Sequence, residues 1–347
     1  MAKANPLTGF EVDPATLKTI GKDLQRPECI LAERDGSLWS ADARGGVVHI
    51  RPDGSQTFIG QQQDTFSDAG DDASRFTTGT LPNGLAFAKN GDILISNFGT
   101  DRLEVMKRSG ESEVLYDQLN GKPIGKVNFV LRDTRNRIWL TVSTTIPNWM
   151  DAISPDISDG FVAMTDEKGL RIIADGFAFT NEIRFDAAEE WLYVVETTGK
   201  CITRLRIDAD GSVSARETFG PTDHDAFIDG IAFDAFGNLW GTHVMTDRIF
   251  ALTPEGDLQI ILDDDNGSLS GKALLAAFEK DEVTPEMTLA CGGTIAPWMA
   301  SVTFGGPDLS TIYIGSLRGT TIPYFTAPVA GLPMVHWNEN NRSMNSE

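Results

Sequence analysis

Several features that mark common enzyme classes are scarce or missing in this sequence of 347 residues. Its three cysteines, Cys29, Cys201 and Cys291, are widely spaced and form no CxxC pair. This argues against a disulfide framework and a cysteine zinc site, and it fits a reducing compartment. There are four histidines and no HExxH, GxSxG, Walker A or GxGxxG motif. These absences exclude the usual zinc protease, serine hydrolase and nucleotide-binding classes.

Long hydrophobic runs and positive charge are also in short supply. No apolar run is long enough to span a membrane, and the N-terminal residues lack the apolar core of a signal peptide, so we expect a cytoplasmic protein. The 29 basic residues are outnumbered by 50 acidic ones, which gives a net charge of −21. Such a surface repels phosphate backbones and anionic lipids. We therefore expect a small-molecule substrate, with neither nucleic acid nor a membrane as partner.

Helical periodicity is nearly absent as well. One stretch, LSGKALLAAFEKDE at 269–282, has the pattern of a helix. A TIM barrel needs a helix after every strand and is excluded. Instead, 34 glycines and 16 prolines punctuate short apolar runs, a texture typical of many short strands joined by turns.

Those short runs follow a repeat that occurs six times. Each copy has a polar residue, a short apolar strand, a turn, and a second strand with a bulky anchor. The anchors lie 45 to 73 residues apart, and they are Trp39, Leu94, Trp139, Tyr193, Trp240 and Tyr313. This spacing predicts an all-β fold, a six-bladed β-propeller that forms a single domain over 1–347. We expect residues 1–24 or 320–337 to close the ring by completing a blade. Insertions at about 60–80, 143–160 and 265–299 should form loops over one face.

The polar residues of the repeat fall eleven or twelve positions before the anchors. In the first five copies they are Glu28, Asn83, Asn128, Asn181 and Asp229, and the sixth copy has Ala300 or Ser301 there. The first strand of each blade lines the central channel of a propeller, so these side chains should meet at one mouth. One such residue alone could simply satisfy backbone groups at a strand end. Five oxygen donors in register instead favour a hard cation, calcium first, with Mg²⁺, Mn²⁺ or Zn²⁺ as alternatives.

Three segments carry a resemblance to a known family. They are FTNEIRF (179–185), FIDGIAFDAFGNLW (227–240) and FGGPDLSTIYIGSLRG (304–319). They resemble blades four, five and six of the SMP-30/gluconolactonase/LRE-like propellers, which include the diisopropylfluorophosphatases. The resemblance implies a metal held by Glu28, Asn128, Asn181 and Asp229, with Asn83 lining the substrate pocket. One departure is that Asn128 precedes Phe129, where the family often has Asn-Asp.

The resemblance and the predicted site together favour metal-dependent hydrolysis of a lactone or related cyclic ester. The metal would polarise the carbonyl, and Asp229 would act as general base or, as in the phosphatase branch, as nucleophile. Substrate-binding candidates are Asn83, Trp149 and His243, for which a structural role is the alternative. Phosphotriester hydrolysis and a calcium-binding propeller without activity remain open. The insertions offer few partners for sugar hydroxyls, which leaves room for a less polar lactone.

Overall fold

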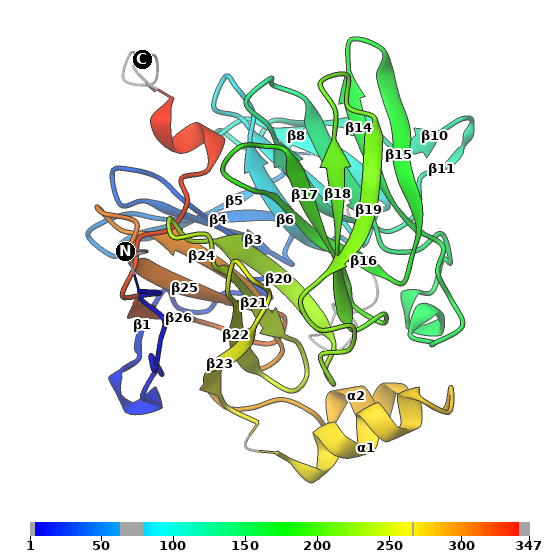
Figure 1. The fold of residues 1–347 in the computed structure, drawn as a ribbon. Coiled ribbons are helices and arrows are strands. Elements are labelled where there is room, and N and C mark those ends of the chain that lie inside the picture. Colours follow the sequence, from blue (N-terminus) through cyan, green and yellow to red (C-terminus); the bar gives the residue numbers. More distant parts are fainter. Residues whose placement is uncertain (1–3, 63–78, 266, 340–347) are drawn as a thin grey trace.

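The computed structural model describes residues 4–62, 79–265 and 267–339, and in it six four-stranded antiparallel sheets surround a central axis (Figure 1). The predicted six-bladed propeller is confirmed. From the inner to the outer strand, blade one consists of β2 (Ile30–Ala32), β3 (Leu38–Asp42), β4 (Gly46–Ile50) and β5 (Gln56–Gly60), and blade two of β6 (Pro82–Phe87), β7 (Ile93–Asn97), β8 (Arg102–Met106) and β9 (Ser112–Tyr116). Blade three consists of β12 (Val127–Arg132), β13 (Ile138–Val142), β14 (Gly160–Asp166) and β15 (Gly169–Phe177), and blade four of β16 (Thr180–Phe185), β17 (Trp191–Glu196), β18 (Cys201–Ile207) and β19 (Val213–Phe219). Blade five consists of β20 (Ile228–Phe233), β21 (Leu239–His243), β22 (Arg248–Leu252) and β23 (Leu258–Asp263).

The sixth blade joins the two ends of the chain. It consists of β24 (Met299–Gly305), β25 (Thr311–Ser316), β26 (Ile322–Thr326) and, as its outer strand, β1 (Lys18–Ile20). β1 pairs antiparallel with β26, with Lys18 opposite Tyr324 and Ile20 opposite Ile322. The ring is therefore closed by hydrogen bonds between segments near the two termini, as predicted.

The helices lie outside the blades. The long insertion between blades five and six forms α1 (Leu269–Phe278) and α2 (Pro285–Leu289), so the predicted helix is present but shorter. Ser268 caps α1, because its hydroxyl accepts the Gly271 N–H at 3.0 Å. The remaining small elements are the 3-10 turns η1 (Pro14–Thr16), η3 (Trp149–Ala152) and η4 (Val335–Asn338) and the hairpin β10 (Gln118–Leu119) with β11 (Lys122–Pro123).

The anchors of the repeat all lie on the second strand of their blades, and all are buried or nearly so. Three of them are tryptophans, and each donates its indole N–H to a carboxylate six residues earlier, in the turn between the first two strands. The pairs are Trp39 with Glu33 at 2.6 Å, Trp139 with Asp133 at 2.9 Å, and Trp240 with Asp234 at 2.9 Å. The recurring acid thus ties the turn to the core, which explains part of the repeat in the sequence.

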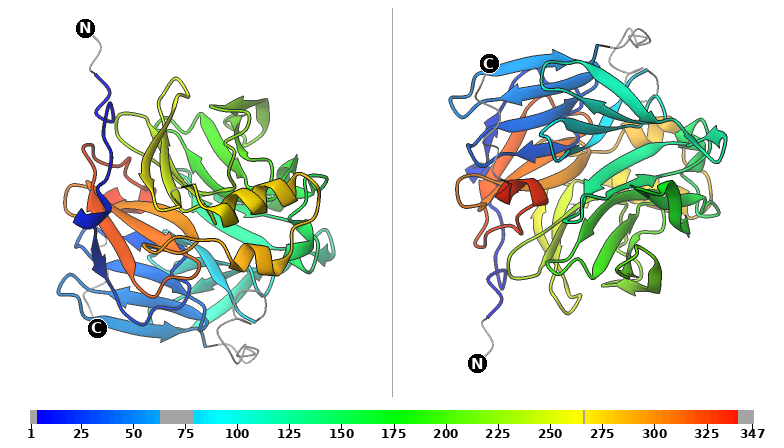
Figure 2. Two further views of the ribbon diagram at one scale, coloured as in Figure 1. Left: turned by 90° about the horizontal axis from the view of Figure 1, so that it is seen from below. Right: turned by 90° about the horizontal axis from the view of Figure 1, so that it is seen from above.

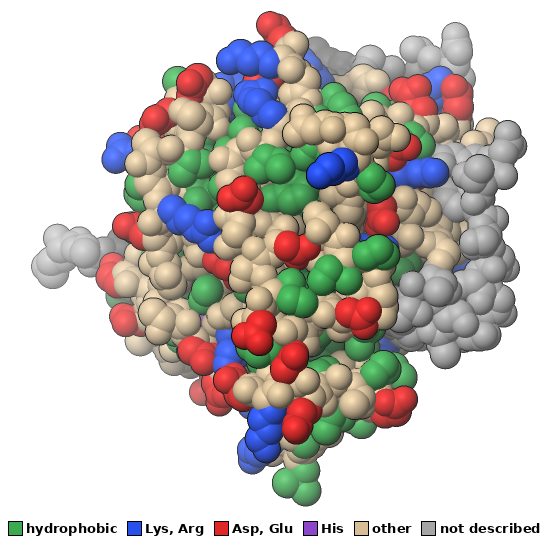
Figure 3. All heavy atoms as spheres, turned by 90° about the vertical axis from the view of Figure 1, so that its right-hand side faces the viewer, with side chains coloured by type: hydrophobic (Ala, Val, Ile, Leu, Met, Phe, Trp, Pro, Cys, Tyr) green, Lys and Arg blue, Asp and Glu red, His purple; other side chains and the backbone are tan. Residues whose placement is uncertain are grey.

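The two ends of the central channel differ. α1 and α2 cover one end, and the C-terminal segment with η4 covers the other (Figure 2). The insertion at 143–160 lies at the helix end, as predicted, whereas most of the insertion at 60–80 lies outside the described residues. On the face shown in Figure 3, acidic and basic side chains are interspersed with apolar ones. Among the helices described, none is long and apolar enough to cross a membrane.

Candidate active site

The inner strands share an irregularity at the position of the polar residue. In blades two to five, the pairing between the first and second strands shifts register next to Asn83, Asn128, Asn181 and Asp229. A β-bulge at the rim of a sheet re-aims a side chain and bends the strand. Each bulge turns an oxygen-bearing side chain into the channel mouth, so the regular spacing seen in the sequence becomes a ring of polar side chains.

Hydroxyls on the second strands stabilise these bulges. A bulge removes a backbone N–H from the ladder, and a buried N–H needs another partner. Gly84 N–H donates to Ser96 Oγ at 2.8 Å, and Gly230 N–H donates to Thr242 Oγ1 at 3.0 Å. The Phe129 N–H donates to Thr141 Oγ1 at 3.0 Å. The geometry of the channel mouth therefore depends on side chains in the strand behind it.

All five predicted polar residues line one cavity of about 60 Å³ at the helix end of the channel. Asn83 joins three blades: its Nδ2 lies 3.0 Å from Glu28 Oε1, 3.0 Å from the Asn128 carbonyl and 3.3 Å from Asn128 Oδ1. Asn181 Nδ2 donates to Thr197 Oγ1 at 3.0 Å. Both amide groups are thereby oriented, and the register argument correctly brings these side chains together.

Two oxygens of this set have no hydrogen-bond donor. Glu28 Oε2 and Asn181 Oδ1 are buried and unpaired among the described residues. An unpaired buried polar atom is costly, and a bound ion is one common reason for such an atom. The donor set of carboxylate and amide oxygens suits a hard cation. The described residues contain no group of three His, Cys, Asp or Glu side chains that could hold a metal, so a cation here would need the amide oxygens.

The charges of the site also favour a bound cation. Burial and then the charge of Asp229 raise the pKa of Glu28 well above its usual value, whereas Arg26 opposes the rise. Burial and then the charge of Glu182 raise the pKa of Asp229, and here Arg26 and Asn181 oppose it. Two buried carboxylates this close repel each other when both are ionised. A bound divalent cation would offset that repulsion. The residues present therefore fit a metal.

Sequence reasoning missed Arg26, which adds a cation to the cavity. Its Nη2 donates to Asn83 Oδ1 at 2.6 Å and its Nη1 to the Pro82 carbonyl at 3.3 Å. Burial lowers the pKa of Arg26, and the charges of Glu28 and Asp229 counter this. Its φ of 56° is unusual for a side chain other than glycine. The sequence does contain a signal for Arg26. This residue lies two residues before Glu28, and most other blades have an apolar residue at the equivalent position of the repeat.

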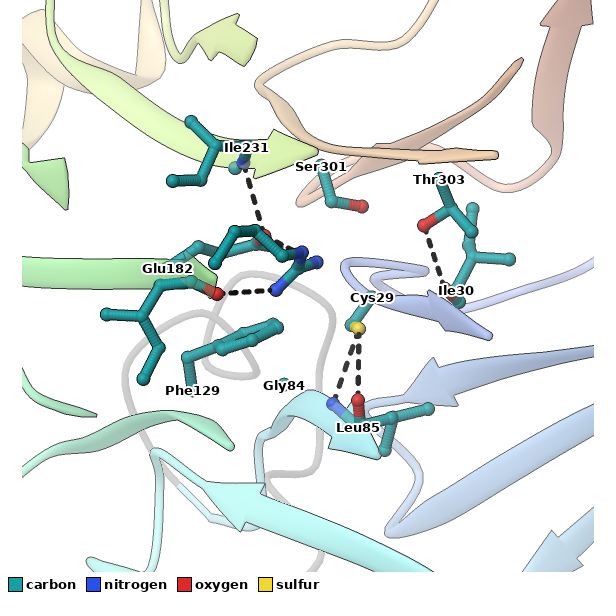
Figure 4. A network of polar contacts seen from close by, with 12 residues as sticks. Cys29, Ile30, Gly84, Leu85, Phe129, Glu182, Ile231, Ser301 and Thr303 are labelled. Carbon is teal, nitrogen blue, oxygen red and sulfur yellow. Dashed lines mark hydrogen bonds and ion pairs between the residues drawn. The ribbon is translucent and has the colours of Figure 1, made fainter. Parts of the chain in front are cut away.

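Deeper in the channel lies a third carboxylate, which the sequence did not single out. Glu182, completely buried, accepts the Ile231 N–H at 3.2 Å and pairs with Arg184 at 2.9 Å (Figure 4). Burial raises the pKa of Glu182 to about 7. Blade three lacks the acid that the family often has beside Asn128, because Phe129 stands there, with the Arg184 guanidinium 4.4 Å from its ring. The buried acid inside the channel is Glu182 of blade four instead.

Above the polar floor the cavity is apolar. We call the following eight lining side chains the roof: Phe98, Trp149, Ile153, Phe179, Val244, Met245, Trp298 and Leu317. They are continuous with Leu274 and Phe278 of α1, which seals them from above. The structure thus places Trp149 in the cavity wall, and its contact with substrate stays a prediction.

His243 lies apart from this wall. Its Nε2 is 3.2 Å from His224 Nδ1, and its ring stacks on Phe250 with centroids 4.6 Å apart. The residues that line the cavity do not include it. A substrate contact for His243 stays a prediction, and the packing gives it a structural setting.

Comparisons with known proteins agree with this architecture. Part of a 6-deoxy-6-sulfogluconolactonase from Pseudomonas putida is 25% identical over 154 residues, which span 44% of this chain and 43% of that relative. A gluconolactonase structure from Xanthomonas campestris is similar with a TM-score of 0.63 and 18% identity, covering 91% of this chain and 89% of its own. The calcium-binding protein regucalcin from Agrobacterium tumefaciens is similar with a TM-score of 0.62 and 14% identity, covering 91% and 96%.

At such identities the two structures establish the fold alone, but the family model goes further. The model of the SMP-30/Gluconolactonase/LRE-like region matches residues 27–263, which include every blade that contributes a polar side chain to the cavity floor. This chain belongs to the SMP-30/gluconolactonase/LRE-like family.

Proposed function

We propose that the protein hydrolyses a lactone or a related cyclic ester at the cavity at the helix end of its channel. The observation that carries this proposal is the pair of unpaired, buried oxygens, Glu28 Oε2 and Asn181 Oδ1, in a cavity that also holds Asp229. The similarity to gluconolactonases supports the choice of substrate class.

Glu28, Asn128, Asn181 and Asp229 would hold one divalent cation, with calcium favoured because every donor is an oxygen. When bound, that cation would polarise the ester carbonyl as a Lewis acid. Asn83 orients Glu28 and Asn128 through its side-chain amide, so its contribution is to position two ligands from neighbouring blades.

The chain's own acid–base chemistry falls to Asp229. We propose that its carboxylate takes a proton from the attacking water as the oxygen of that water adds to the carbonyl carbon. The ring C–O bond then breaks, and the protonated Asp229 returns the proton to the leaving ring oxygen. Burial raises the pKa of Asp229 and so makes its carboxylate a stronger base, which favours this role. Coordination of a cation by the same carboxylate would lower its basicity. Arg26 places a positive charge beside the same floor, where it can hold the developing negative charge and then the carboxylate of the product.

The test is a panel of lactones assayed with protein stripped by a chelator and then reloaded with calcium. We expect hydrolysis only after reloading. Turnover of phosphotriesters but not lactones would favour the phosphotriesterase alternative. Tight calcium binding without turnover of either class would favour a binding protein.

A further inference from the structure

The polar groups of the cavity floor are already committed. Asn83 uses its amide nitrogen on Glu28 and Asn128 and its oxygen on Arg26. The Thr197 hydroxyl donates to the Ile228 carbonyl at 2.7 Å and accepts from Asn181. The remaining oxygen donors are those assigned to the cation. Among the described residues, the floor therefore has little left for substrate hydroxyls beyond the remaining N–H groups of Arg26 and the Asn128 side-chain NH₂.

The roof adds almost nothing polar. Its side chains are aliphatic, aromatic or thioether, and Val244, Met245 and Trp298 are buried. The indole N–H of Trp298 already donates to the Cys291 carbonyl at 3.1 Å. One donor remains in the roof, the Trp149 indole N–H, which is buried and has no partner among the described residues. The cavity thus combines a charged floor with a wall that can supply one hydrogen bond.

We propose that this cavity selects an apolar lactone, one whose ring bears an alkyl or aryl substituent, over a polyhydroxylated sugar lactone. The inference rests on the proposed function, because it assumes that the ester group sits on the floor. The ring substituent then faces the roof, where it replaces water on apolar surface. Each hydroxyl of a sugar lactone would instead lose its water partners in this wall and gain at most one from Trp149.

The expected discrimination is large. A hydrophobic pocket rejects an analogue that adds one hydroxyl by roughly 10²-fold. A sugar lactone carries several hydroxyls, so we expect a preference of at least about 10²-fold for the apolar ring.

Lactams test the selectivity separately from catalysis, because they keep the ring and its carbonyl but are not hydrolysed by a lactonase. We would titrate calcium-loaded protein calorimetrically with an alkyl-substituted δ-lactam and with its polyhydroxylated counterpart. The proposal expects the alkyl lactam to bind at least about 10²-fold more tightly. Equal binding, tighter binding of the polyhydroxylated ring, or no binding of either lactam would overturn it.

A matched pair of variants locates the effect. Val244→Thr keeps the shape of a roof side chain and adds a hydroxyl, so it should reduce the preference several-fold. Val114→Thr makes the same change at an exposed position on β9, at 39% exposure, and should leave the preference unchanged. Equal effects of the two variants would contradict the assignment to the roof.

The corresponding lactones separate this inference from the proposed function. If the lactams are discriminated but neither lactone is hydrolysed, the selectivity stands and the proposed function fails. If both lactones are hydrolysed and the sugar lactone is preferred, the function stands and the selectivity fails.

Discussion

The cavity floor places two carboxylates with different expected roles in one site. Asp229→Asn keeps an oxygen ligand but removes the proposed base, so kcat should fall by on the order of 10²–10⁴ even at saturating calcium. Glu28→Gln should act mainly by weakening calcium binding, so added calcium should restore part of its activity. Steady-state kinetics across a calcium titration distinguish the two. Wild-type kcat in Asp229→Asn at saturating calcium would show that Asp229 is a ligand only.

Arg26 should oppose cation binding while assisting the reaction. Its positive charge shares the floor with the proposed ligands, so Arg26→Gln should bind calcium more tightly, on the order of tenfold. The same variant should lower kcat, because a group that can hold the negative charge developing in the transition state is gone. Calorimetry and kinetics on one preparation measure both effects. Weaker calcium binding in Arg26→Gln would mean that Arg26 matters chiefly by orienting Asn83.

The buried histidine pair makes stability depend on pH. Burial lowers the pKa of His224 to about 4, and Asp223 opposes this. In the unfolded chain the ring has its usual pKa near 6.5, so the unfolded state binds more protons between these values. The free energy of unfolding should therefore decrease as pH falls from about 6.5 to 4, by at most about 3 kcal/mol from this group.

His224→Phe removes this titration, so denaturant unfolding at several pH values should show a shallower loss for the variant. The difference between the two curves isolates the contribution of His224 from that of the buried acids Glu28 and Asp229. Their pKa values are raised in the folded state, so these acids make the free energy of unfolding increase as pH falls. Parallel curves for wild type and variant would contradict the assignment.

At this scale the sequence correctly brought five polar side chains to one cavity, because five blades repeat the same position, and their role as metal ligands stays a prediction. It did not single out Arg26 or Glu182, since each occupies a repeat position where the other blades mostly have small or apolar residues. A comparison of every repeat position across the blades, rather than of the ligand position alone, would have shown both.

Bulges in the inner strands bring the polar residues of the repeat together at the candidate site. Thr242→Val keeps the shape of the side chain but leaves the Gly230 N–H without its acceptor, next to Asp229. We expect a loss of about 1–3 kcal/mol in the free energy of unfolding and weaker calcium binding. Thr242→Ser, which retains the hydroxyl, is the control and should lose much less. Unchanged calcium affinity in Thr242→Val would show that the bulge does not depend on this hydroxyl.

The strands and their order could be predicted because each blade repeats an anchor and a turn. The bulges could not be predicted, because a register shift depends on how two strands pair. In the sequence it is marked only by a serine or threonine on the second strand. Of the roof, the sequence predicted loops over one face and singled out Trp149 alone. Its apolar surface arises when residues distant in sequence, such as Phe98, Phe179 and Trp298, meet at the channel mouth.

At the scale of the whole molecule, the two ends of the chain hold the ring together. β1 completes the sixth blade, and the C-terminal segment crosses the far end of the channel. There His336 Nε2 lies 2.9 Å from the Ala32 carbonyl, and Arg132 pairs with Glu339. The far end is thus tied across several blades and holds a cavity of about 290 Å³, whose lining includes Ala32, Arg132 and His336, whereas the helix end holds the cavity of about 60 Å³ with the candidate site. The ring itself is closed by the pairing of β1 with β26 in the sixth blade.

One cation is proposed to join four blades at the helix end, and anomalous diffraction from crystals grown with calcium would locate it. We expect a single strong peak among Glu28, Asn128, Asn181 and Asp229, with oxygen distances of roughly 2.3–2.6 Å. Glu28 Oε2 and Asn181 Oδ1 should be among the coordinating atoms. The absence of a peak there in crystals soaked at saturating calcium, or a peak that these side chains do not coordinate, would contradict it.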